Sequence, residues 1–243
     1  VWQTFTDFEF IIINDGSTDS SADILQAYDD PRLRIIDQAN VGLTRSLNRG
    51  IALAQGEYIA RMDDDDISLP ERLARQVAFL NTHPDIGVVG SACRIVDELN
   101  GREWEQQVPL SDEQLRHHLI RGNPFVHTSV MMRKSVLQAA GGYNEAYPYI
   151  QDYELWVRLA GHTRLANLLE VLVVRRYHWR AVSTTRSTEL LRLWLRMRIR
   201  YKAFQYLDYP SYYALYIFQP ILLTLLELRP KLALYLNLKR RFR

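Results

Sequence analysis

The sequence EYIARMDDDD at residues 57–66 joins a short apolar run to four consecutive carboxylates, and a helix start containing Pro70 follows it. In α/β proteins the carboxyl ends of strands face the crevice in which ligands bind. Four adjacent anions repel one another unless a cation absorbs their charge, and clustered oxygen ligands suit a hard ion such as Mg²⁺ or Mn²⁺. A solvated acidic loop is the alternative. The strand before the carboxylates and the helix after them favour a metal site.

Apolar runs and helical patterns alternate on both sides of this segment. Residues 8–13 are typical of a buried parallel strand, and the turn NDGSTD at residues 14–19 follows them. Further strands are predicted at 33–36, 86–96, 127–132 and 171–177, and helices at 43–54, 112–119, 135–140 and 152–160. Ser68 and Glu71 predict a capping box. The alternation predicts an α/β fold, with a mainly parallel, Rossmann-like sheet flanked by helices.

Composition limits the class of protein. An apolar content of 47% excludes a disordered chain, and one cysteine, Cys93, excludes an internal disulfide. The lack of disulfides suits a cytoplasmic location. The chain opens at Val1 on residues that resemble the end of a helix, so we expect an upstream strand and helix.

The last quarter of the chain differs from the rest. Residues 1–185 have a net charge of −7 and residues 186–243 a net charge of +9, which predicts a body domain and a basic helical tail. Arg192, Arg196 and Arg200 share one predicted helical face, with Trp194 and Tyr201 toward the other. The apolar run at 212–226 is shorter than the roughly 20 residues that a spanning helix needs.

This tail predicts a peripheral helix on the cytoplasmic face of a membrane. The alternative is a C-terminal helix packed on its own domain or in a dimer. Nucleic-acid binding is a poor fit, because the cations of the tail alternate with apolar bulk and the body is acidic.

Several motifs in order resemble glycosyltransferase family 2, the inverting enzymes of the GT-A fold. The matching segments are FIIINDGSTD at 10–19, NVGL at 40–43, AQGEY at 54–58, RMDDDD at 61–66 with SLPERL at 68–73, QDYELW at 151–156, and RYH at 176–178 with Ser183 beyond. The family's opening strand has no counterpart here. Asn14 and Gln151 stand where many members have Asp and Glu.

The resemblance implies roles for the residues near the start of the chain. Asp65 would bind Mn²⁺ or Mg²⁺ on the donor diphosphate, and Asp63 would contact the metal or the nucleoside ribose. Asp15 would bind the nucleotide base, with a turn-forming Asp as the alternative. Arg61 is expected at the donor, and Asp66 is a weaker candidate for a sugar contact.

The resemblance also implies roles for later residues. Asp152 would be the general base, although an Asp at a helix start is also a favoured cap. Arg176 and His178 would bind the diphosphate. The alternative is that they are ordinary surface charges at a strand end. His127 is a weaker candidate for the acceptor pocket, because a lone His is more often structural.

These expectations combine into one predicted activity. The chain would move a sugar from a nucleotide-sugar donor, a UDP-sugar, to a hydroxyl of a glycan or lipid-linked acceptor, by metal-assisted direct displacement in cell-wall or polysaccharide biosynthesis. The alternatives are a nucleotidyltransferase, which product analysis would distinguish, and a non-catalytic module that binds nucleotide-sugars. The sugar, the acceptor and the linkage stay open.

Overall fold

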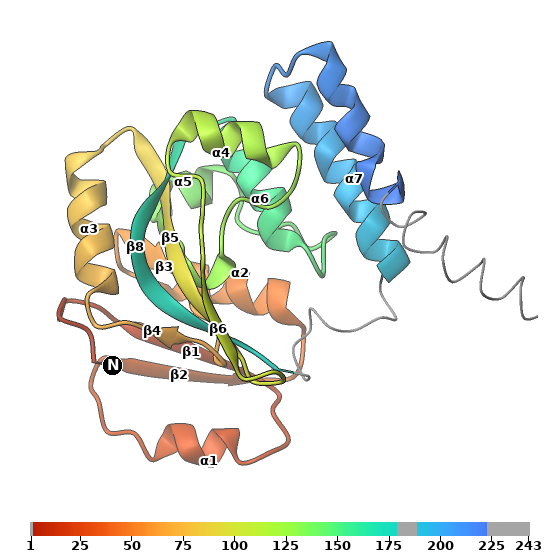
Figure 1. Cartoon of the computed structure of the whole chain (residues 1–243). Coiled ribbons are helices and arrows are strands. Elements are labelled where there is room, and N and C mark those ends of the chain that lie inside the picture. Colours follow the sequence, from red (N-terminus) through yellow and green to blue (C-terminus); the bar gives the residue numbers. More distant parts are fainter. Residues whose placement is uncertain (1, 179–188, 223–243) are drawn as a thin grey trace, which may run out of the picture.

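The computed structural model describes residues 2–178 and 189–222, which form a small and a large β-sheet with helices around them (Figure 1). The small sheet pairs β1 (Phe10–Asp15) in parallel with β2 (Leu33–Gln38). The helix α1 (Ser21–Gln26) connects them, and α2 (Leu43–Leu53) packs against β1. This unit presents the ends of β1 and β2 together, because paired parallel strands end at the same edge.

The large sheet has the strand order β3-β7-β5-β8-β4, with β6 paired to the other part of β5. Its strands are β3 (Tyr58–Ala60), β4 (Ile67–Ser68), β5 (Ile86–Asp97), β6 (Arg102–Gln106), β7 (Met131–Arg133) and β8 (Arg164–Tyr177). The long strands β5 and β8 run in parallel, whereas the other four pairs in this sheet are antiparallel. The α/β class is therefore confirmed, but the sheet is mixed rather than mainly parallel.

Helices cover both faces of the large sheet. Val88 of β5 faces a core formed with α4 (Asp112–Leu119), α5 (Lys134–Ala139) and α6 (Gln151–Ala160). The next residue, Val89, faces a second core with Leu80 of α3 (Arg72–Thr82). Successive strand residues point to opposite faces, so β5 needs apolar residues in unbroken sequence to fill both cores.

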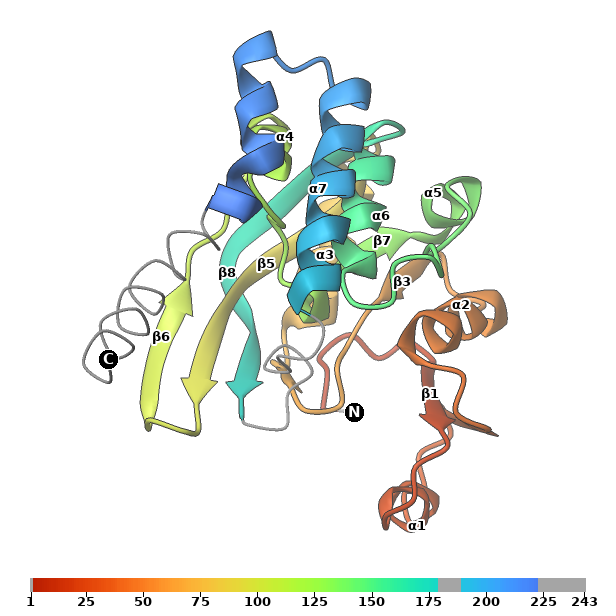
Figure 2. The ribbon, with the colours of Figure 1, turned by 90° about the vertical axis from the view of Figure 1, so that its right-hand side faces the viewer.

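The helix at residues 189–206 lies beside α6 in both views (Figures 1 and 2). Leu195, Ile199 and Ala203 of α7 (Glu189–Tyr206) are buried at i, i+4 and i+8 in the core that contains α6. A 3₁₀ turn at Ser211–Ala214 then leads into a helix through residue 222. The alternative in which the tail packs on its own domain therefore describes α7.

The predicted faces of α7 were wrong. Arg200 is 6% exposed, and Trp194 and Tyr201 are each about half exposed. A buried guanidinium is stable where backbone carbonyls accept its hydrogen bonds. The acceptors of Arg200 come from segments distant in sequence, so the local pattern could not indicate its burial. Ser183 and the tail from residue 223 onward lie outside the described residues.

Two local predictions were also wrong, and one strand was missed. Ser68 lies in β4 instead of capping a helix, and α3 begins after Glu71 with no side-chain cap. Residues 127–129 form a 3₁₀ turn before β7, so the predicted strand is short. The edge strand β6 was not predicted, because its polar residues lack an apolar alternation.

Across residues 2–178 and 189–222, the structure contains no helix with the length and apolar character needed to cross a bilayer.

Candidate active site

The acidic run lies between β3 and β4, where the chain leaves one edge of the large sheet and rejoins it at the other. One carboxylate oxygen from each of Asp63, Asp65 and Asp66 lies within 4.8 Å of the others, a set here called the carboxylate cluster. Asp64 is exposed and outside it. Three oxygen ligands at this spacing fit a hard divalent ion.

Buried groups hold the first residue of the cluster in place. The guanidinium of Arg61, whose side chain is 5% exposed, donates to both carboxylate oxygens of Asp63. The Asp63 backbone N–H donates to Thr128 Oγ1 over 3.1 Å. Arg72 is fully buried and donates to the backbone carbonyls of Arg61 and Val130, which ties β3 to the segment before β7. Buried groups therefore fix the orientation of the Asp63 carboxylate.

The end of β8 contacts the other two residues of the cluster. His178 Nε2 lies 2.9 Å from an oxygen of Asp65, and the backbone N–H of Arg176 donates to Asp66 over 2.9 Å. Burial raises the pKa of Asp66, and the charges of Asp63 and Asp65 raise it further. A divalent cation would relieve this repulsion, so the chemistry of the residues fits a bound metal.

Asp15 ends β1 and braces the turn that leads into α2. Its carboxylate accepts hydrogen bonds from Gln38 Nε2 and from the backbone N–H groups of Val41 and Gly42, at 2.6–2.9 Å. Desolvation raises its pKa, but these hydrogen bonds outweigh that effect and the pKa is lowered. Asp15 is therefore an ionised residue at the edge of the small sheet, with both oxygens already engaged.

A pocket of about 160 Å³ opens beside the carboxylate cluster. It brings together two predicted site residues that are 89 positions apart, Asp63 and Asp152, and a third, His127. The other residues that line it are Gln106, Asn123, Phe125, Val126, Thr128 and Arg175.

Asp152 is the second residue of α6, and Ile150 is the N-cap residue. The capping alternative therefore does not describe Asp152. One of its oxygens accepts a hydrogen bond from Asn123 Nδ2 over 2.6 Å. Burial raises the pKa of this carboxyl above its ordinary value. A carboxylate with a raised pKa is a stronger proton acceptor than a solvated one.

His127 lines the pocket as a neutral ring. Burial holds its pKa well below the usual range, with the charge of Arg61 as a second cause. Its Nε2 lies 2.7 Å from the Tyr143 hydroxyl, and the ring meets Trp156 edge-on. These contacts fix the orientation of the ring and shape the pocket wall.

The structure separates Arg176 from the pocket. Its side chain is exposed and pairs with Glu98 over 2.8 Å, and only its backbone reaches the carboxylate cluster. Sequence reasoning missed Arg175, Asn123 and Gln106. The alternation of side chains along β8 is the one signal that could have indicated Arg175 in place of Arg176.

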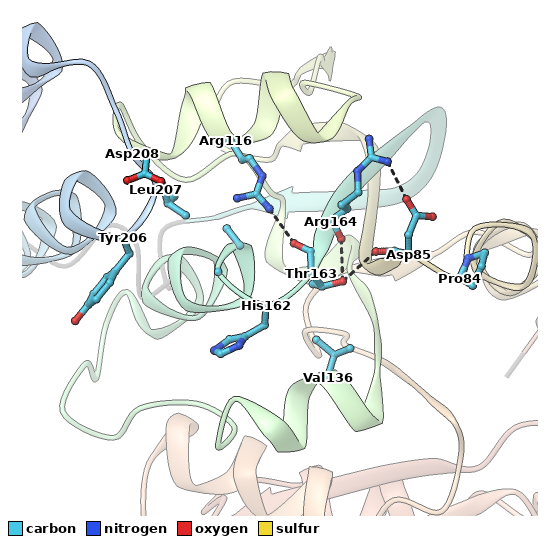
Figure 3. Close-up of a pocket in the computed structure, with 12 residues that line it drawn as sticks. Pro84, Asp85, Arg116, Val136, His162, Thr163, Arg164, Tyr206, Leu207 and Asp208 are labelled. Atoms are coloured by element: carbon cyan, nitrogen blue, oxygen red, sulfur yellow. Dashed lines mark hydrogen bonds and ion pairs between the residues drawn. The ribbon is translucent and has the colours of Figure 1, made fainter.

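A larger hollow of about 670 Å³ lies at the other end of the sheet, where β8 begins (Figure 3). Its arginines are engaged, Arg164 with Asp85 and Arg116 with Asp112 and the Thr163 carbonyl. The predicted site residues lie elsewhere, near the carboxyl ends of the strands, where α/β proteins bind ligands. We therefore take the smaller pocket as the candidate active site.

Comparisons with known proteins agree with this fold. The family model described as Glycosyl transferase family 2 matches residues 2–141. The amylovoran biosynthesis glycosyltransferase AmsE of Erwinia amylovora is 34% identical over 181 residues, which cover 70% of this chain and 65% of that protein. The chain spans only 57–65% of the length of the first curated relatives it matches.

Solved structures share the fold. The crystal structure of S. aureus TarS with UDP-GlcNAc has a TM-score of 0.71 at 18% identity, covering 88% of this chain and 62% of that chain. The mannosyltransferase PcManGT from Pyrobaculum calidifontis, in complex with GDP-Man and Mn²⁺, has a TM-score of 0.61 at 18% identity and covers 84% and 57%.

Proposed function

The chain belongs to glycosyl transferase family 2, and from that premise we propose that it transfers a sugar from a UDP-sugar to a hydroxyl of a glycan or lipid-linked acceptor. The observation that carries this proposal is the placement of Asp63 and Asp152 in one pocket. Asp63, which can bind the donor, and Asp152, which can accept a proton, therefore line the same pocket.

On the donor side, Asp65 and Asp63 would hold Mn²⁺ or Mg²⁺, and Asp66 completes the carboxylate cluster. A bound divalent ion supplies neutralisation of the negative charge that develops on the leaving diphosphate. Arg61 sets the orientation of Asp63, and His178 lies against Asp65, where it can contact the same diphosphate. For Arg176 to bind the diphosphate directly, its side chain would first have to leave Glu98.

Asp15 lies at the edge of the small sheet, where the family pattern places the nucleotide base. Its oxygens already accept three hydrogen bonds, so a base contact would use a remaining lone pair or replace one of them. In both cases Asp15 also positions the turn at residues 40–42.

On the acceptor side, Asp152 would take the proton of the attacking hydroxyl. The acceptor oxygen forms a bond to the anomeric carbon, and the bond from that carbon to the diphosphate breaks with its electron pair. Displacement in one step inverts the configuration at this carbon. Asn123 donates to one oxygen of Asp152 and orients the carboxylate in the pocket.

Titration of UDP by calorimetry, with and without Mn²⁺, tests the donor site. We expect Mn²⁺-dependent binding in the wild type that Asp65→Ala abolishes. Asp64→Ala is a matched control, because it removes an exposed carboxylate of the same run from outside the cluster. GDP is titrated in parallel to identify the base. Absence of nucleotide binding in the wild type would reject the proposal.

We further infer that residues 186–243 attach the protein peripherally to the cytoplasmic face of a membrane. Support comes from exposed apolar side chains on the two C-terminal helices, which include Leu190, Trp194, Leu215, Phe218 and Leu222. The net charge of +9 in this segment suits an anionic lipid surface.

A further inference from the structure

Two neighbouring arginines of β8 point to opposite faces of the large sheet. Arg175 lines the pocket with Asp152, whereas the side chain of Arg176 pairs with Glu98 on the other side. Arg175 is opposite Ile95 of β5, and both lie on the face that carries the buried residues Cys93 and Val173. Strand alternation therefore assigns only the first arginine to the pocket.

Arg175 has no hydrogen bond or ion pair with any residue in the described part of the chain, although its side chain is partly buried. The two carboxylates that line the pocket already have hydrogen-bond donors. Asp63 has Arg61, and Asp152 has the amide of Asn123. A guanidinium carries five donors and is always charged, so a partly desolvated one without an anion is unusual.

A second donor lies on the same face. Gln106 of β6 is opposite Cys93, and its amide oxygen accepts a weak hydrogen bond from the Cys93 thiol at 3.8 Å. Among the described residues, nothing accepts from the amide nitrogen of Gln106, which lines the pocket with Arg175. A guanidinium and an amide N–H₂ group on one wall of the pocket suit a carboxylate or a phosphate group.

We propose that the acceptor carries an anionic group, bound by Arg175 and Gln106, next to the hydroxyl that Asp152 deprotonates. This assignment rests on the proposed glycosyl transfer and names its acceptor class. In the proposed arrangement the donor diphosphate already has the metal ion and His178 as partners, which leaves Arg175 and Gln106 for the acceptor. Arg175 would also offset the repulsion between the bound anion and the carboxylate of Asp152.

Three probes test this assignment: methyl glucuronide, methyl glucoside 6-phosphate and the neutral methyl glucoside. Each is titrated into the full chain with and without UDP and Mn²⁺, and binding is followed by NMR shifts of the arginine Nε–Hε groups. We expect both anionic probes to bind more tightly than the neutral one, and the tighter of the two distinguishes a sugar acid from a phosphate ester. Arg175→Gln should weaken their binding about tenfold or more.

Arg94→Gln is the matched control. Arg94 is an exposed residue of β5 opposite Val174 of β8, on the other face from Arg175, and its loss should leave probe binding unchanged. Equal affinity of the wild type for charged and neutral probes, including binding of none, would overturn the assignment. Unchanged probe binding in Arg175→Gln would also overturn it. The same holds if Arg175→Gln, but not Arg94→Gln, loses affinity for UDP and keeps its affinity for the probes. Failure of the wild type to bind any nucleotide would instead reject the proposed function, and the titrations without UDP would still decide the role of Arg175.

Discussion

We expect the Asp152 carboxylate to have opposite effects on stability and on activity. Its raised pKa means that the folded chain binds this proton more tightly than the unfolded chain does. Between the ordinary pKa and the raised one, the folded state therefore holds more protons, and stability falls as the pH rises. We expect Asp152→Asn to remove this dependence and to be at least as resistant to heat at neutral pH as the wild type.

The same substitution should reduce sugar transfer by about 10²–10⁴-fold, because a positioned base is worth that much. Affinity for the nucleotide should stay near the wild-type value. Thermal melts at pH 5 and pH 8 and a transfer assay measure the two effects, with Asp64→Asn as the control. An equal loss of nucleotide affinity would contradict a role confined to the acceptor side.

The carboxylate cluster predicts a stabilising response to metal. A bound cation favours the folded state, by about 2.7 kcal/mol when the ion is at 100 times its dissociation constant. We expect Mn²⁺ to raise the melting temperature at neutral pH. The effect should decline as the pH falls through the raised pKa of Asp66, where protonation competes with the ion. Asp65→Ala should show little response, and an equal response in that variant would place the ion elsewhere.

At the scale of elements, Gly16 fits closely against the turn that joins the small sheet to α2. Gly16 has φ +76°, and a Cβ there would lie 2.8 Å from the backbone nitrogen of Asn40. Gly16→Ala should therefore destabilise the fold by about 1–3 kcal/mol and weaken UDP binding, because it displaces the turn that Asp15 braces. Gly101 also has positive φ but has no atom within 4 Å of an added Cβ, so Gly101→Ala measures the backbone strain alone. Equal effects in urea unfolding would contradict the contact argument.

The C-terminal helices predict a membrane phenotype from exposed residues alone. Replacing Leu215, Phe218 and Leu222 by Ser should reduce sedimentation with phosphatidylglycerol vesicles about tenfold or more, because each apolar side chain favours burial. Thermal stability should not change. Leu169→Ser is the control, since this exposed leucine lies on β8. Unchanged sedimentation of the triple variant would reject the attachment of these helices to a membrane.

At the scale of the whole molecule, Arg200 joins the C-terminal helices to the body domain. Its guanidinium donates to the carbonyls of Arg121 and Tyr216 and to Gln219 Oε1, from inside the protein. Arg200→Met leaves these acceptors without a donor and should cost about 1–3 kcal/mol in urea unfolding. Arg196→Met, in which an exposed arginine of the same helix is replaced, should cost much less. Similar losses in the two variants would contradict this role.

Burial of Leu195, Ile199 and Ala203 in the main core has a consequence for experiments on the tail. Deletion of residues 186–243 would expose that core, so it would confound membrane attachment with unfolding. Substitutions of exposed residues separate the two.

The sequence by itself determined the class of fold, the order of the motifs and the acidic run, because each depends on residues close together in the chain. The turn at 14–19, the helices at 112–119 and 152–160, and the carboxylates after β3 could all be predicted from local pattern. The tertiary structure alone decided which residues meet. Pairing of β5 with β8 sets the face on which Arg175 lies, and a shift of one residue in its side-chain alternation would place Arg176 there. Packing of α6 brings Asp152 to the pocket of Asp63, and packing of α7 buries Arg200. These contacts join segments distant in sequence, and local periodicity carries no information about them.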